Sequence, residues 1–102
     1  MKIHLRGKAR TREIWLNGKE LKPWRSLKVR NHSPTGFNYG YNGSGPAQLA
    51  LAVCLEIYPE GIARRIYQIF KEEYIATLPC AQDFDRKITV WNEEEAERIV
   101  NS

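Results

Sequence analysis

The sequence has few of the residues that build disulfide frameworks and metal centres. It contains two cysteines, two histidines and one methionine among 102 residues. No two of the cysteines and histidines have the spacing of a zinc site, so we expect no metal and no cofactor. In a chain without secretory features two cysteines do not imply a disulfide, and we expect Cys54 and Cys80 to be buried, reduced thiols.

Long hydrophobic runs are also missing. No stretch approaches the roughly 18 apolar residues of a membrane span, and Met1–Lys8 lack the apolar segment of a signal peptide. We therefore expect a cytoplasmic protein with no membrane partner. The composition, 42% hydrophobic and 27% charged, is that of an ordinary soluble protein, and the length suits a single domain over residues 1–102.

Acidic residues are scarce at the N-terminal end. Residues 1–30 carry ten lysines and arginines against two glutamates, a net charge of +8. Residues 31–102 carry six against ten acidic residues, a net charge of −4. A basic N-terminal lobe favours binding of nucleic acid, nucleotides or an acidic protein, but a solvated hairpin would have the same charge. Both interpretations stay open.

The first thirty residues predict a small antiparallel sheet. Short strands are expected at Ile3–Leu5 and Glu13–Leu16, and Asn17-Gly18 is typical of a type I′ turn leading to a strand at Lys19–Leu21. Leu27–Arg30 alternates apolar with basic residues, which predicts another half-buried strand. On this interpretation the solvent-exposed face of the sheet carries a basic patch made of Arg6, Lys28 and Arg30.

The rest of the chain predicts helices and one strand. The segment from Pro46 to about Tyr58 is apolar nearly all round, so it should be a buried central helix. A second, amphipathic helix is expected from about Glu60 to Ala76, then a strand at Ile88–Trp91 and a helix that Asn92 and Glu95 open as a capping box. The expected fold class is α+β: a small antiparallel sheet packed on the central helix, with the amphipathic helix and a short C-terminal strand and helix.

The loop Asn31–Ser44 and the helix start behind it are the most distinctive stretch. Gly45-Pro46 is a good helix start, because proline at the first helical position gives up an N–H that would lack a partner. Free backbone N–H groups and the helix dipole then meet at Ser44, an arrangement that binds anions. The loop is not a Walker motif, since no lysine follows the glycines, nor a dinucleotide fingerprint, since Gln48 replaces the third glycine.

The aromatic residues of this loop alternate in sequence. In an extended loop Phe37, Tyr39 and Tyr41 would share one face, where nucleic-acid bases could stack. Core packing is the commoner fate of such rings, and we expect at least one to be buried. The three tryptophans should lie in the core or at its edge: Trp15, Trp24 and Trp91.

The leading hypothesis is a small binding protein for a nucleotide or other phosphate-containing ligand. Backbone and hydroxyl groups of Gly43, Ser44 and Gly45 would contact phosphate, and an arginine of the basic lobe would neutralise its charge. The other predicted contacts are specificity from Asn38, Asn42 and Gln48, and stacking from Tyr39 and Tyr41. Gln48 could instead hydrogen-bond back to the loop.

Three alternatives remain from the residues alone. His32 could be the acid or base of a nucleotide phosphodiesterase, since histidine titrates near neutral pH. The basic hairpin could bind protein or nucleic acid. The glycine loop could also be purely structural. A buried helix in so small a chain makes a homodimer possible in each case.

The run from Asn31 to Ala52 also resembles the signature of an uncharacterised domain family of phages, archaea, bacteria and mobile elements. The family pattern reads His-Ser-Pro-x-Gly-Phe-x-Trp-Gly-Tyr-x-Gly-Ser-Gly-Pro-Ala-Gln-Leu-Ala, and this chain departs from it at Tyr39, where tryptophan is usual. The resemblance implies an association with viruses or mobile genetic elements. It therefore suggests a protein that acts on host defence signalling, in the host cytoplasm if the source is viral.

Overall fold

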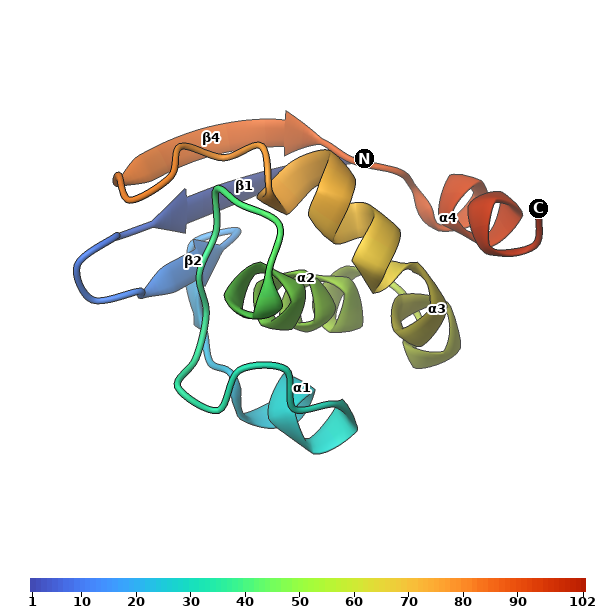
Figure 1. The fold of residues 1–102 in the computed structure, drawn as a ribbon. Helices are drawn as coiled ribbons and strands as arrows, with labels where there is room; N and C mark the ends of the chain where they lie inside the picture. The colour runs from blue at the N-terminus through green and yellow to red at the C-terminus, as the bar shows by residue number, and fades with distance from the viewer.

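The computed structural model describes residues 1–102 and confirms the α+β fold class. A four-stranded antiparallel sheet has the order β3-β2-β1-β4 (Figure 1). Its strands are β1 (Lys2–Gly7), β2 (Ile14–Leu16), β3 (Lys19–Leu21) and β4 (Phe84–Thr89). The predicted hairpin is present, and Asn17 and Gly18 have the positive φ angles, 51° and 84°, that a type I′ turn requires.

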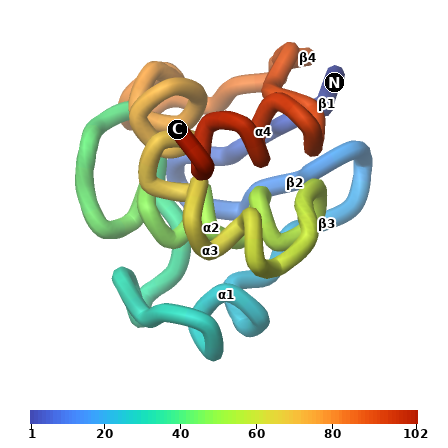
Figure 2. The backbone as a smooth tube through the Cα atoms, turned by 90° about the vertical axis from the view of Figure 1, so that its right-hand side faces the viewer, coloured from blue at the N-terminus to red at the C-terminus, as the bar shows by residue number.

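The helices lie on one side of this sheet (Figures 1 and 2). They are α1 (Trp24–Val29), α2 (Ser44–Ile57), α3 (Glu60–Phe70), which continues into the π-helical turn η1 (Lys71–Ile75), and α4 (Glu93–Val100). The capping box at Asn92 and Glu95 is present in both directions. No helix is both long enough and apolar enough to cross a bilayer.

Helix α2 is the centre of the core, as its composition predicts. Every residue from Gly45 to Leu55 is buried, and the α2 side chains pack against the inward-facing side chains of the sheet and against α3. Leu5 and Ile14 of the sheet and Phe70 of α3 are fully buried in the same cluster. The alternation of buried and exposed residues along β1 puts Lys2, His4 and Arg6 on the opposite face, which no helix covers.

Two predicted elements are wrong in type or position. Leu27–Arg30 is not a strand but lies in and just after α1, where the Leu27 N–H donates to the Pro23 carbonyl and the Arg30 N–H to the Ser26 carbonyl. Ser26 is buried and Val29 is half-buried, and a separation of three residues is typical of one face of a helix. The four residues Leu27–Arg30 are too few to reveal this helical spacing. The last strand begins earlier than predicted, at Phe84, and ends at Thr89 because its partner β1 begins at Lys2.

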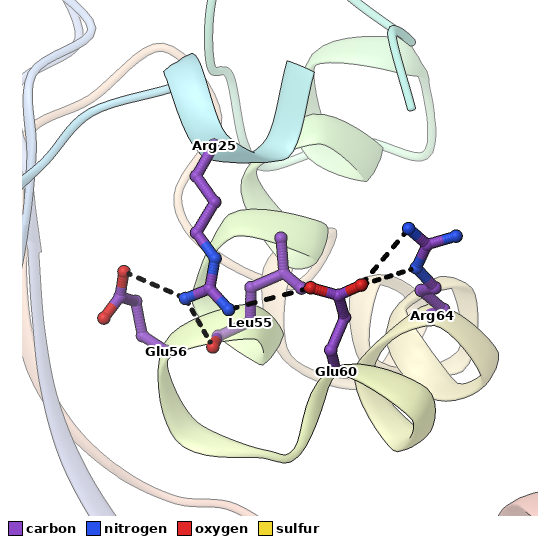
Figure 3. A network of polar contacts seen from close by, with 5 residues as sticks. All are labelled: Arg25, Leu55, Glu56, Glu60 and Arg64. Atoms are coloured by element: carbon purple, nitrogen blue, oxygen red, sulfur yellow. Dashed lines mark hydrogen bonds and ion pairs between the residues drawn. The ribbon is translucent and has the colours of Figure 1, made fainter. Parts of the chain in front are cut away.

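An arginine holds α1 against the junction of α2 and α3. Arg25 Nη1 donates to the Leu55 carbonyl at 3.1 Å and lies 3.9 Å from Glu56 Oε1. Glu60 at the start of α3 lies 4.0 Å from the same guanidinium and pairs with Arg64 at 3.2 Å (Figure 3). Helix α1 is therefore held against the core by polar contacts at the C-terminal end of α2.

Candidate ligand-binding site

The structure divides the predicted loop residues into a buried and an accessible group. Tyr39 is 1% exposed, its ring packs edge-on against Phe84 at 4.7 Å, and its hydroxyl donates to the Gln82 carbonyl. Burial, and then the charge of Asp83, raise the pKa of this phenol. Tyr39 is therefore a core residue, which corrects the prediction that it stacks on a ligand. Phe37 is buried as well, whereas Tyr41 is 43% exposed.

Gln48 belongs to the buried group and uses all of its hydrogen-bonding capacity inside the protein. Its Oε1 accepts from the backbone N–H groups of His32 and Ser33, at 2.7 and 3.1 Å. Its Nε2 donates to Ser26 Oγ and to the Arg30 carbonyl. The side chain has no exposed surface. Gln48 thus bonds back to the loop, the alternative open in the sequence, and has no group left for a ligand.

The glycines of the loop allow close backbone contacts. Gly45 is buried, and a β-carbon there would lie 2.6 Å from Asn38 Cβ. Gly43 is the N-cap of α2, and a β-carbon at this position would lie 2.6 Å from the Tyr41 ring. The two glycines therefore seat Asn38 and Tyr41 directly beside the first turn of α2.

The start of α2 differs slightly from the prediction. The helix begins at Ser44, so Pro46 occupies its third position and not its first. Proline is tolerated there because the first four N–H groups of a helix have no partner inside it. Gly43 has no side chain to cap them, and Ser44 is exposed. Asn42, the preceding loop residue, is exposed too.

A cavity of about 470 Å³ lies beside this helix start. Three loops form it: the β1–β2 connection, the glycine-rich loop and the turn before β4. Its lining residues are Ala9, Arg10, Arg12, Asn38, Tyr41, Cys80, Ala81 and Asp83. We call it the Arg10–Tyr41 cavity. Two of the eight predicted ligand residues, Asn38 and Tyr41, are thereby brought together with two arginines from outside the predicted basic patch.

The side chains that line this cavity carry a net positive charge, with two arginines against one aspartate. Neither Arg10 nor Arg12 forms an ion pair with a carboxylate. The one acidic lining residue, Asp83, accepts a hydrogen bond from the Ala9 N–H at 2.9 Å. Two unpaired guanidinium groups favour an anion, and their planar donor sets suit phosphate oxygens.

The backbone of the cavity is held in an unusual conformation at two points. Arg12 and Ala81 have φ angles of 61° and 56°, although neither is a glycine. Such left-handed residues cost of the order of 1 kcal/mol or more and often occur at functional sites. The Arg12 N–H is fixed by the Lys8 carbonyl at 2.8 Å. The arginine is thus positioned by a strained turn.

Sequence reasoning did not identify Arg10 and Arg12. The alternating basic residues at positions 8, 10 and 12 could have indicated a charged site. The local sequence of their loop, however, does not indicate that the loop lies close to Tyr41. The predicted patch is instead dispersed. Arg6 lies on the open sheet face with its guanidinium 4.2 Å from the Trp15 ring centre, and Lys28 and Arg30 lie at α1.

The cysteines and tryptophans fit the predictions only in part. Cys54 is buried and burial raises its thiol pKa, but Cys80 is exposed; both are free thiols. Trp91 packs against Phe70 and Tyr74 at the edge of the core. Trp24, however, is 65% exposed, which corrects its placement at the core.

His32 is held by polar contacts away from every cavity. Its Nε2 lies 2.6 Å from the Tyr67 hydroxyl, and its backbone is bound by Gln48. It lines none of the four cavities. Burial, followed by the charges of Arg30 and Lys71, lowers its pKa below the ordinary value of 6.5. These contacts give it no carboxylate partner, so no feature of its surroundings favours the phosphodiesterase alternative.

The lowered pKa of His32 predicts a pH dependence of stability. The unfolded chain takes up a proton at this histidine at higher pH than the folded chain does. The stability that neutral His32 contributes is therefore present above its unfolded pKa of 6.5 and is lost as the pH falls through the folded pKa. Urea unfolding should show a smaller loss between about pH 7 and about pH 5 for His32→Gln than for the unmodified protein. Equal losses would contradict this assignment.

The comparisons with known proteins add the family of the chain. The model of a family of unknown function, DUF6166, matches residues 5–101. Comparison with curated proteins and with solved structures gave no match. The matched range contains the glycine-rich loop, all four helices and the three loops of the Arg10–Tyr41 cavity. The chain therefore belongs to DUF6166, a family of unknown function.

Proposed function

We propose that this protein binds a nucleotide or other phosphate-containing ligand in the Arg10–Tyr41 cavity. The observation that carries the proposal is the presence of two unpaired guanidinium groups and a partly exposed tyrosine ring around one cavity of about 470 Å³. Arg10 and Arg12 would hold phosphate oxygens, and Tyr41 would stack on a base or another flat group. Volumes of this order are ordinary for small-molecule sites.

The adjoining helix start supports the same ligand chemistry. Asn38 and Tyr41, which line the cavity, contact Gly45 and Gly43 in the first turn of α2. The N–H groups of that turn have no partner inside the helix, and the positive end of the helix dipole lies there, so the turn would add attraction for an anion. Ser44 and Asn42 are exposed there and would supply further hydrogen bonds. Tyr39 and Gln48 take no part.

The proposal predicts binding that depends on Arg10 and Tyr41. Purified protein is screened by thermal unfolding against inorganic phosphate, mononucleotides and cyclic oligonucleotides. A ligand that binds only the folded state adds roughly 2.7 kcal/mol of apparent stability at a hundredfold excess over its Kd. Arg10→Gln and Tyr41→Ala should each weaken that ligand by about tenfold or more, since hydrogen bonds to charged groups contribute roughly 1.5–3 kcal/mol and base stacking about 1–3 kcal/mol.

Arg86→Gln is the matched control. Arg86 is exposed, forms no ion pair and lines none of the cavities, so its replacement removes the same charge elsewhere. A ligand whose binding falls equally in Arg86→Gln and Arg10→Gln responds to net charge, which would contradict the site. A screen without any stabilising phosphate compound would contradict the proposed function. The cytoplasmic location and the action on host defence signalling stay predictions.

A further inference from the structure

The Arg10–Tyr41 cavity adjoins other cavities, with which it shares lining residues. It shares Arg12 with a cavity of about 260 Å³ that extends to α1, and that one shares Trp24 with a cavity of about 460 Å³ between β3 and α1. On its other side it shares Asp83 with a cavity of about 310 Å³ at the β1–β4 edge. Together the four cavities extend from α1 past the β1–β2 loop to the start of β4. We call this row of cavities the basic groove.

Trp24 stands in the groove without a packing role in the core. It is 65% exposed, the highest exposure of any large hydrophobic side chain, and it borders two of the cavities. The inward side of the same helix is formed by Ser26 and Val29. An indole ring left largely in water is available to stack on a flat partner. Tyr41 offers a second such ring farther along the groove.

Positive charges outnumber negative charges along the groove, which favours binding of a polyanion. The carboxylates of the groove are all engaged within the protein: Glu13 by Thr11, Glu20 by Lys22, Glu56 by Arg25, Asp83 by the Ala9 N–H and Asp85 by His4. Six lining cations have no carboxylate partner: Arg6, Lys8, Arg10, Arg12, Lys19 and Lys28. Eight lysines and arginines against five carboxylates give the lining of the four cavities a net charge of +3, and the excess lies in the Arg10–Tyr41 cavity and in the cavity between β3 and α1.

We infer that the basic groove binds single-stranded nucleic acid. Aromatic side chains on which successive bases stack, set in a positively charged groove that follows the backbone, are the general features of single-strand binding. Bases in a duplex are stacked on one another and do not offer their faces to Trp24 and Tyr41. The inference rests on the proposed function, because the Arg10–Tyr41 cavity would hold one nucleotide of the strand.

The test compares a twelve-nucleotide oligothymidylate with a mononucleotide and with a duplex of equal length, by fluorescence anisotropy of the labelled oligonucleotides. The single strand should bind at least tenfold more tightly than the mononucleotide. Trp24→Ala should weaken the single strand by about tenfold and leave mononucleotide binding unchanged, whereas Trp24→Phe should retain most of the affinity. Because Trp24 is exposed, its replacement leaves the core intact. Lys28→Gln should lower the slope of log K against log salt by about 0.7.

Each of the other results would overturn the inference. Equal affinity for single strand and mononucleotide, with no effect of Trp24→Ala, would show that the Arg10–Tyr41 cavity binds a small ligand and that the groove does not bind a strand. Equal affinity for the duplex, or displacement of the strand by polyglutamate of the same charge, would show a site for any polyanion or for an acidic protein. If neither the oligonucleotides nor the mononucleotide bound, both the proposed function and the inference about the groove would be wrong.

Discussion

Gly40→Ala should destabilise the protein by about 3 kcal/mol or more, a loss typical of severe backbone conflict. Gly40 has a φ angle of +82°, and a β-carbon there would lie 2.4 Å from Cys80 Cα and 2.6 Å from Cys80 N. These are backbone atoms, which cannot rotate away as a side chain would. The Gly40 N–H also donates to the Ile75 carbonyl at 3.1 Å, so moving the loop would break that bond.

Gly18→Ala is the matched control for this loss. Gly18 has nearly the same φ angle, +84°, but a β-carbon there would meet nothing within 4 Å. Alanine at Gly18 therefore carries only the cost of the left-handed conformation, roughly 1–2 kcal/mol. Urea unfolding of the two variants separates the steric conflict from the conformational cost. Equal losses would show that the loop moves away from Cys80 without penalty.

The same substitution should affect the candidate site. Gly40 precedes Tyr41, and its contact partner Cys80 lines the Arg10–Tyr41 cavity together with Tyr41. Displacing the loop from Cys80 would change the spacing of two walls of the cavity. Gly40→Ala protein that is still folded at low temperature should therefore bind the phosphate ligand more weakly, whereas Gly18→Ala protein should bind it normally.

Gln48→Leu should cost about 3 kcal/mol of stability, which corresponds to a fall in Tm of at least 10 °C for a domain of this size. Leucine has a similar volume but leaves the N–H groups of His32 and Ser33 without their acceptor and Ser26 without its donor. Buried polar groups that lose their partner bear the cost of desolvation, roughly 1–3 kcal/mol each when water cannot reach them.

Gln68→Leu provides the comparison for Gln48. Gln68 is exposed on α3 and its side chain makes no hydrogen bond within the protein, so its replacement should change the free energy of unfolding by less than about 0.5 kcal/mol. Thermal unfolding of both variants measures the difference. Similar Tm values for the two would mean that water takes over the contacts of Gln48 and that the start of the glycine-rich loop is held by other groups.

Local sequence signals determined several elements without any tertiary information. The Asn17-Gly18 turn depends on two residues that tolerate positive φ, and the α4 capping box on Asn92 and Glu95, three positions apart. The length and uniform apolar character of α2 were enough to predict its central place. Each of these features depends on residues that are neighbours in the chain, so the physical cause lies within the segment itself.

Other features were decided only by contacts between distant segments. Leu27–Arg30 has an alternation that suits a strand, yet Ser26 is bonded to Gln48, 22 residues away, and the segment is helical. Strand β4 begins and ends where its distant partner β1 allows.

The candidate site shows the same division. The residues of the loop alone predict that a glycine-rich segment with polar groups leads into a buried helix. Tertiary packing sets which side chains of that loop face solvent, since Tyr39 and Tyr41 have the same local pattern but are 1% and 43% exposed. It also brought Arg10 and Arg12 to Tyr41. The physical reason is that burial and charge proximity depend on how the sheet, α2 and the loops pack together, and no short stretch of sequence contains that information.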